Sequence, residues 1–208
     1  HRIYSEGILG KVGKGNELVQ GLFNRPHQYM QTAQEIHNQI DTENGYTEFD
    51  TKVTIEKLLD WEEGYRGAPY HCSEGYVTYG IGHRLSNIKD EPLDNYSGVW
   101  ISQSDAERLL TQDLLKLHSN IGQSSFATYY DELSNDRQII IESMAYQIGI
   151  AGVADFHKMW IDIRGGDFRG ASSEMIDSLW REQTPERAKR HAEVMEYGDL
   201  KHVYGTYL

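Results

Sequence analysis

The chain has 208 residues, of which 38% are hydrophobic and 25% are charged, and its mean hydropathy is −0.63. This composition predicts a globular protein with its own core, and no stretch approaches the roughly 18 apolar residues of a membrane span. Its 20 Lys and Arg residues against 32 Asp and Glu residues give a net charge of −12. We therefore expect no nucleic-acid partner and no membrane insertion. The single cysteine, Cys72, excludes an internal disulfide and a cysteine-rich zinc site.

The first 50 residues differ in amino-acid composition from the rest of the chain. They begin with five glycines in 21 residues and continue with mostly polar side chains. One short helix is predicted over residues 28–40, and no chemical motif stands out. We expect residues 1–50 to be an arm or linker that docks on a partner protein, and residues 51–208 to form the main domain.

A helix is predicted to begin after Thr54, which is a suitable capping residue, and to end at Gly64. Its apolar face continues at helical spacing onto Glu62 and Glu63. Burial and the negative end of the helix dipole both raise the pKa of a carboxyl group in such a position, which favours a proton donor near neutral pH. The alternative is a glutamate that is simply solvated at the helix end, and this interpretation fits Glu62 in particular.

Residues 70–83 carry aromatic, Val and Thr side chains around Glu74-Gly75, which predicts a small β-hairpin. A turn there is expected to bring Cys72 and Thr78 close together across the strands. A proton donor facing two small polar groups suits the hydrolysis of a glycosidic bond, with water held opposite the acid. A partly buried cysteine is more often a packing residue, so the pattern alone leaves both interpretations of Cys72 open.

The remainder of the chain predicts helices over residues 102–118, 134–149, 168–180 and 184–198. The first begins at a Ser–Asp capping pair, and the last begins with proline in its first turn. The second is apolar on several faces and is expected to be the central buried helix. A helix, a small sheet and then several helices make an α+β arrangement.

The order Glu63, eight residues, Cys72, five residues, Thr78 matches the Glu-x8-(Asp/Cys)-x5-Thr pattern of the phage-type lysozymes, glycoside hydrolase family 24. The chain resembles this family over residues 53–208. The resemblance implies the phage-type lysozyme fold, with a small β-hairpin sheet and a mainly helical lobe. It also implies a muramidase that hydrolyses the β-1,4 bond between N-acetylmuramic acid and N-acetylglucosamine in peptidoglycan, without a metal or organic cofactor. Further similar blocks lie at residues 62–66, 74–83, 147–156 and 180–190.

The resemblance implies that Glu63 protonates the leaving oxygen while Thr78 and Cys72 place the attacking water. Most members have Asp at the position of Cys72. Its thiol is then a thiolate base, a nucleophile or a passive group that positions water. We favour water placement, because a thiolate base needs a pKa well below the ordinary value of about 8.5.

Two arginines of the last long helix match positions that contact the acidic pair in the family. Arg187 is expected to face Glu63, and Arg190 to face Glu62. The alternative is a pair of solvated arginines on a helix surface.

Tyr146 and Gln147 match positions that line the sugar cleft of the family, and ordinary helix packing is the alternative. His83 and Asp113 match a structural ion pair. Trp180 is expected to be a core residue.

Three stretches look closer to the lysozyme domain of the T-even tail baseplate hub than to the free endolysin: residues 137–138, 144–147 and 177–180. The acidic charge and the N-terminal arm agree with this. We therefore expect a virion component of the tail baseplate that acts on the cell wall in the host periplasm, with other tail proteins as partners. The alternatives are a free endolysin, a non-catalytic structural or wall-binding hub component, and a lytic transglycosylase.

Overall fold

The computed structural model describes residues 53–205 and 207–208. The chain divides into two units, His1–Thr51 and Lys52–Leu208, and all described residues belong to the second. The helix expected over residues 28–40, and the whole expected arm, lie outside the described residues.

Helix α4 (Ile55–Glu63) forms as predicted from its capping residue and its apolar face. The Thr54 hydroxyl accepts a hydrogen bond from the Lys57 amide at 3.3 Å, and the helix ends at Gly64 with a φ of 66°. Leu58 and Leu59 are fully buried, which directs this face of the helix into the core.

Three antiparallel strands follow in the order β1 (Arg66–His71), β2 (Tyr76–Gly80) and β3 (His83–Lys89). The third strand was not predicted, because its mostly exposed side chains lack the alternation that marks a half-buried strand. The register pairs Tyr70 with Thr78, and the Cys72 amide donates to the Tyr76 carbonyl at 3.0 Å. Thr78 thus pairs directly with Tyr70, two residues before Cys72.

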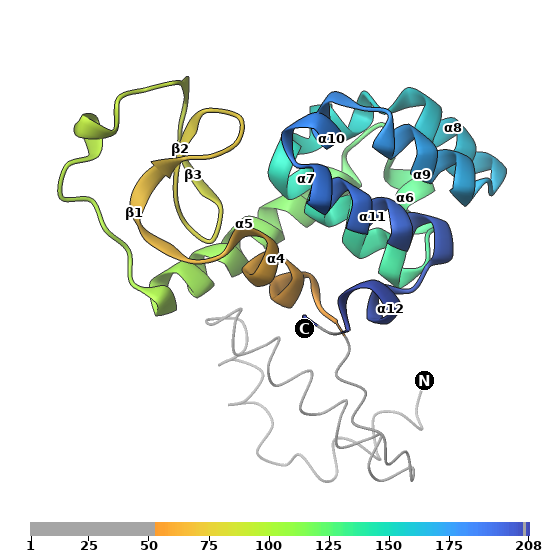
Figure 1. The fold of residues 1–208 in the computed structure, drawn as a ribbon, viewed down its shortest axis with the longest axis horizontal. Coiled ribbons are helices and arrows are strands. Elements are labelled where there is room, and N and C mark those ends of the chain that lie inside the picture. Colours follow the sequence, from red (N-terminus) through yellow and green to blue (C-terminus); the bar gives the residue numbers. More distant parts are fainter. Residues whose placement is uncertain (1–52, 206) are drawn as a thin grey trace, which may run out of the picture. The chain divides into compact units, whose positions relative to one another are not determined.

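Helix α5 (Gln103–Gly122) follows the short 3-10 helix η1 (Leu93–Tyr96) and leads from the sheet to the helical part of the domain (Figure 1). The Ser102 hydroxyl accepts from the Asp105 amide at 3.1 Å and donates to its carboxylate at 2.7 Å. The predicted capping pair is thus confirmed, and the helix runs four residues further than expected.

Helix α7 (Asn135–Ala154) is the central buried helix, as predicted. Every residue from Ile139 to Ala145 is buried, and each fully buried Ile or Met side chain contributes roughly 1.5–3 kcal/mol to stability. Gly149, with φ 80° and ψ 166°, breaks the helix where its end was expected. Ser134 precedes the helix, but within the described chain its side chain makes no capping hydrogen bond.

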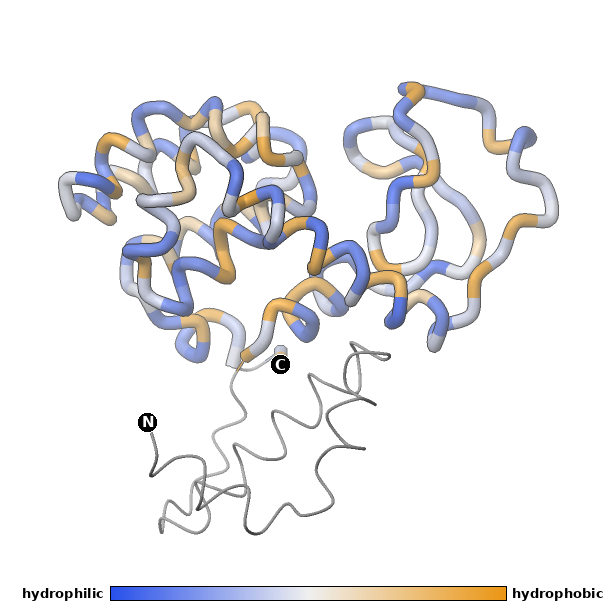
Figure 2. Tube along the Cα trace, turned by 180° about the vertical axis from the view of Figure 1, so that it is seen from behind, coloured by the Kyte–Doolittle hydropathy of each residue, from blue (hydrophilic) through white to orange (hydrophobic). Residues whose placement is uncertain are grey.

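The predicted helix over 168–180 is two helices, since the chain breaks at Asp177 and the Ser178 hydroxyl caps a new start by accepting from the Arg181 amide at 3.2 Å. The last long helix begins at Pro185, and Gly198 caps its end after Tyr197, as predicted. Along these helices hydrophobic stretches alternate with hydrophilic ones (Figure 2). The helices that surround α7 or follow it are α6 (Ala127–Asp131), α8 (His157–Gly165), α9 (Phe168–Ile176), α10 (Leu179–Gln183), α11 (Pro185–Tyr197) and α12 (Leu200–Tyr204).

The mostly helical domain with a small three-stranded sheet confirms the expected α+β class. In the described part of the chain, no single helix is long and apolar enough to cross a membrane. Among the described helices, only α7 and α8 taken together pass that test, and a bend of 95° separates them.

Candidate functional site

A cleft of about 320 Å³ lies where the sheet faces the helical part of the domain. The three strands with their turns form one wall, and the end of α4, helix α7 and the start of α11 contribute the rest. Of the residues singled out from the sequence, Arg190, His83 and Asp113 lie outside this lining. The others line it: Glu62, Glu63, Cys72, Thr78, Tyr146, Gln147 and Arg187.

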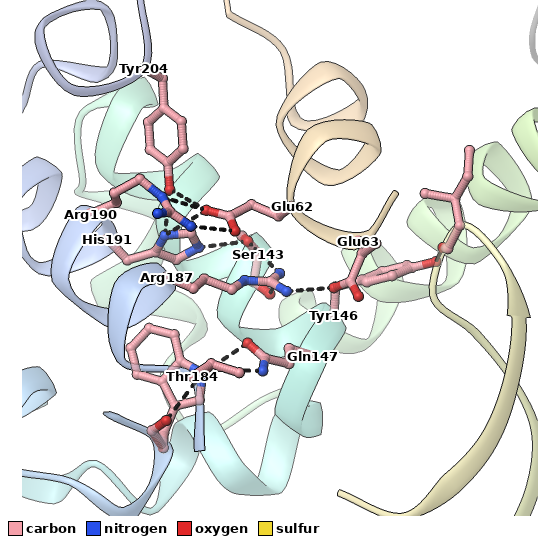
Figure 3. Close-up of polar contacts among 12 residues, drawn as sticks. Glu62, Glu63, Ser143, Tyr146, Gln147, Thr184, Arg187, Arg190, His191 and Tyr204 are labelled. Carbon is pink, nitrogen blue, oxygen red and sulfur yellow. Dashed lines mark hydrogen bonds and ion pairs between the residues drawn. The ribbon is translucent and has the colours of Figure 1, made fainter. Parts of the chain in front are cut away.

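Glu63 is the last residue of α4, and its side chain is 17% exposed. Nη1 of Arg187 donates to Oε1 of Glu63 at 2.6 Å, which is the contact that the resemblance implies (Figure 3). The backbone at Gly82 packs directly on this carboxyl group, because a Cβ there would lie 3.0 Å from Cδ of Glu63. The Glu63 carboxyl group is therefore held between the Arg187 guanidinium and the backbone at Gly82.

The carboxylate of Glu62 is directed toward α11 and α12 instead of Arg187, and the Glu62 side chain is only 3% exposed. Arg190 donates to both of its carboxylate oxygens, at 3.1 and 2.8 Å, and the Tyr204 hydroxyl donates to Oε1 at 2.7 Å. The alternative of a solvated Glu62 is wrong, because these partners compensate its burial. Removing one side of a buried ion pair leaves an uncompensated charge, so this cluster ties α4 to α11 and α12.

Thr78 is 2% exposed, and its hydroxyl donates to the Tyr76 carbonyl at 3.0 Å. Cys72 is half-buried in the same wall. Tyr70, which the sequence reasoning missed, also lines the cleft. Burial and then the nearby charge of Glu63 raise the pKa of Tyr70 to about 12, so its hydroxyl stays protonated and remains a hydrogen-bond donor at neutral pH.

Tyr146 and Gln147 lie on the floor of the cleft with their polar groups already engaged. The Tyr146 hydroxyl donates to the Ile81 carbonyl at 2.6 Å, and burial raises its pKa well above the ordinary range. The Gln147 amide accepts from Nε1 of Trp180 at 2.8 Å and donates to Thr184 at 3.3 Å, which fixes its orientation. Trp180 is buried in the core, as predicted.

Behind the cleft lies a buried polar cluster that the sequence reasoning did not find. His191 is fully buried, with Nε2 2.7 Å from Ser143 Oγ and Nδ1 2.7 Å from the Tyr204 hydroxyl (Figure 3). Burial, followed by the charges of Arg187 and Arg190, lowers the pKa of His191 well below its ordinary value of 6.5. The sequence signal that could have indicated this cluster is the position of His191 four residues after Arg187, because that spacing puts both residues on one face of a helix.

Nδ1 of His83 lies 2.5 Å from Oδ2 of Asp113, so this pair joins the start of β3 to α5. Its place outside the cleft agrees with the structural role that the resemblance implies. Across residues 53–205 and 207–208, no cluster of three or more His, Cys, Asp or Glu side chains is arranged to hold a metal ion.

Sequence comparison relates the chain to known proteins. A sequence model of the phage lysozyme family matches residues 60–192. Two relatives from Dictyostelium discoideum, probable T4-type lysozymes 1 and 2, are 30% identical over 163 residues and 29% identical over 164 residues. Each alignment covers 71% of this chain and 96% of the relative. The pre-baseplate central spike protein Gp5 of Enterobacteria phage T4 is 28% identical over 170 residues, which are 74% of this chain but only 30% of Gp5. The chain therefore belongs to the phage lysozyme family of glycoside hydrolases.

Proposed function

We propose that the protein is a muramidase that hydrolyses the β-1,4 bond between N-acetylmuramic acid and N-acetylglucosamine in peptidoglycan. The observation that carries this proposal is the largely buried Glu63 in a cleft whose opposite wall holds Cys72 and Thr78. In its protonated form, Glu63 donates a proton to the leaving glycosidic oxygen. The bond between the sugar carbon and that oxygen breaks as water attacks the carbon from the other face and releases a proton to the solvent, so the configuration at that carbon is inverted.

Cys72 and Thr78 are proposed to position the attacking water. The Thr78 hydroxyl uses its hydrogen on the Tyr76 carbonyl, so its oxygen remains available as an acceptor for a water molecule. Full activity in a Cys72→Ala variant would contradict this role.

The proposal is tested by product analysis on purified Gram-negative peptidoglycan. The wild type is compared with Glu63→Gln and with Glu186→Gln, which makes the same chemical change at an exposed position outside the cleft lining. We expect free reducing muramic acid ends from the wild type and from Glu186→Gln, and almost none from Glu63→Gln. Anhydro ends would assign the protein as a lytic transglycosylase. No product from any of the three would favour a structural or wall-binding role.

We further propose that the protein is a tail baseplate component that acts in the host periplasm, with residues 1–50 docking on neighbouring baseplate proteins. The similarity to Gp5 and the net charge of −12 support this setting over a free endolysin. Mass spectrometry of purified virions is expected to detect the protein, and deletion of residues 1–50 is expected to abolish its incorporation. Its absence from virions, together with its presence in lysates, would identify a free endolysin.

A further inference from the structure

The two adjacent glutamates of α4 lie at opposite ends of one chain of polar contacts (Figure 3). The intermediate side chains come from α7, α11 and α12, so this series of polar contacts crosses the interior of the helical part of the domain. Each step along it is 2.6–2.9 Å long. In order, its members are Glu63, Arg187, Ser143, His191, Tyr204 and Glu62.

The chemistry of the two ends fixes the direction of every hydrogen bond between them. Arg187 has only donors, so Ser143 Oγ accepts from its Nη2 at 2.9 Å. The Glu62 carboxylate has only acceptors, so the Tyr204 hydroxyl donates its hydrogen to Glu62. The Tyr204 oxygen then accepts from Nδ1–H of His191, whose Nε2 is left to accept the Ser143 hydroxyl hydrogen.

The groups that face His191 favour this neutral tautomer. Arg187 and Arg190 on its own helix repel a positive charge, and burial disfavours any charge. On α4, Oε1 of Glu62 is 3.9 Å from Nδ1 and is already engaged by Arg190 and Tyr204. On α10, the ring of Trp180 packs edge-on against the imidazole. His191 is therefore a neutral bridge with one donor and one acceptor.

The guanidinium of Arg187 depends on Ser143 for its orientation. Nη2 donates to both the hydroxyl and the carbonyl of Ser143, at 2.9 and 3.3 Å, while Nη1 holds Glu63. Nε of Arg187 is buried and has no hydrogen-bond partner among the described residues. The Ser143 anchor is thus what sets the angle at which Arg187 presents Nη1 to Glu63.

We propose that His191 is a positioning residue, which holds the Ser143 hydroxyl toward Arg187 and thereby fixes the carboxyl group of Glu63 in the cleft. This inference rests on the proposed role of Glu63 as the proton donor. His191 itself touches neither substrate nor reacting atoms. His191 changes the fraction of molecules in which the Glu63 carboxyl group is correctly placed. We therefore expect kcat to depend on His191 and KM to be independent of it.

A pair of substitutions separates positioning from simple packing. In His191→Gln, the side-chain amide lies near the position of Nε2 and keeps an acceptor for Ser143. In His191→Asn, the shorter amide lies near Nδ1 and keeps only the contact with Tyr204. We expect kcat to fall by up to about 100-fold in His191→Asn, with KM unchanged and substantial recovery in His191→Gln.

Tyr130→Phe is a matched control for the loss of stability. The Tyr130 hydroxyl donates to the buried Glu142, as Tyr204 does to Glu62, but neither Tyr130 nor Glu142 lines the cleft. Tyr130→Phe is expected to lower the unfolding temperature and leave kcat unchanged. Should His191→Asn fail to fold, Ser143→Ala removes the hydroxyl that anchors Nη2 of Arg187, leaving only the longer contact with the Ser143 carbonyl, and is expected to show the same loss of kcat.

The inference is overturned if His191→Asn and His191→Gln are folded and have the same kcat, or if neither differs from Tyr130→Phe. It is also overturned if Ser143→Ala keeps wild-type kcat. Glu63→Gln, assayed in parallel, identifies which claim fails. An inactive Glu63→Gln beside a fully active His191→Asn refutes the positioning role alone, whereas an active Glu63→Gln refutes the proposed function itself.

Discussion

The backbone at Gly82 lies against the proposed acid, and Gly82→Ala tests whether the position of that acid controls the reaction. The residue has a φ of 69°, in the left-handed region that favours glycine. A Cβ there would lie 3.0 Å from Cδ and Cγ of Glu63 and 3.0 Å from Cε1 of Tyr146. The added methyl group therefore presses on the carboxyl group and on the ring beside it.

The magnitude follows from two separate effects. Left-handed backbone costs alanine about 1–2 kcal/mol, which appears as a loss of stability. Carbon atoms prefer separations of about 3.5–4.0 Å, so Glu63 must retreat by about 0.5–1 Å from the methyl group. A displacement of that size costs up to about 100-fold in rate, and we expect kcat to fall by about 10- to 100-fold.

Gly166→Ala is the matched control, since Gly166 has a φ of 76° and no atom within 4 Å of its would-be Cβ. Both variants are expected to lose similar stability in urea unfolding, whereas only Gly82→Ala loses kcat in a peptidoglycan turbidity assay. The reasoning is refuted if Gly82→Ala is folded and its kcat matches that of Gly166→Ala.

Three further predictions concern stability. Arg190→Ala leaves Glu62 buried without its cation and is expected to cost about 3–5 kcal/mol in chemical denaturation at pH 7; a cost near zero would contradict a compensated buried pair. The lowered pKa of His191 means that its stabilising effect holds above pH 6.5 and is lost as pH falls below it, by up to about 1.4 kcal/mol per unit. The unfolding free energy of His191→Gln is expected to depend less steeply on pH in this range, and parallel curves would disprove the assignment. Tyr146→Phe removes the bond to Ile81 and should cost about 1 kcal/mol, readable as a lower unfolding temperature.

Local signals were sufficient for the elements that carry most of the candidate site. The capping hydroxyl of Thr54 and the glycine at 64 bound α4, and the proline at 185 begins α11. These signals depend on the backbone preferences and hydrogen bonds of a few neighbouring residues, so they can be read without knowing the fold. Where no such signal existed, as at the exposed strand β3, the sequence failed to predict the element.

Sequence pattern was enough to place Glu62 and Glu63 together at a helix end, with Cys72 and Thr78 at the spacing of the phage-type lysozymes. The pattern did not show which glutamate faces the cleft and which is buried. Adjacent residues of a helix differ by about 100° in direction, and the packed neighbours determine what each direction faces. Packing of the folded domain buries the Glu62 side chain against Arg190 and leaves Glu63 facing the cleft. Packing also makes His191 a fully buried bridge, since its environment comes from helices far apart in sequence. Short-range preferences act within a few residues, whereas burial and charge pairing are properties of the assembled core.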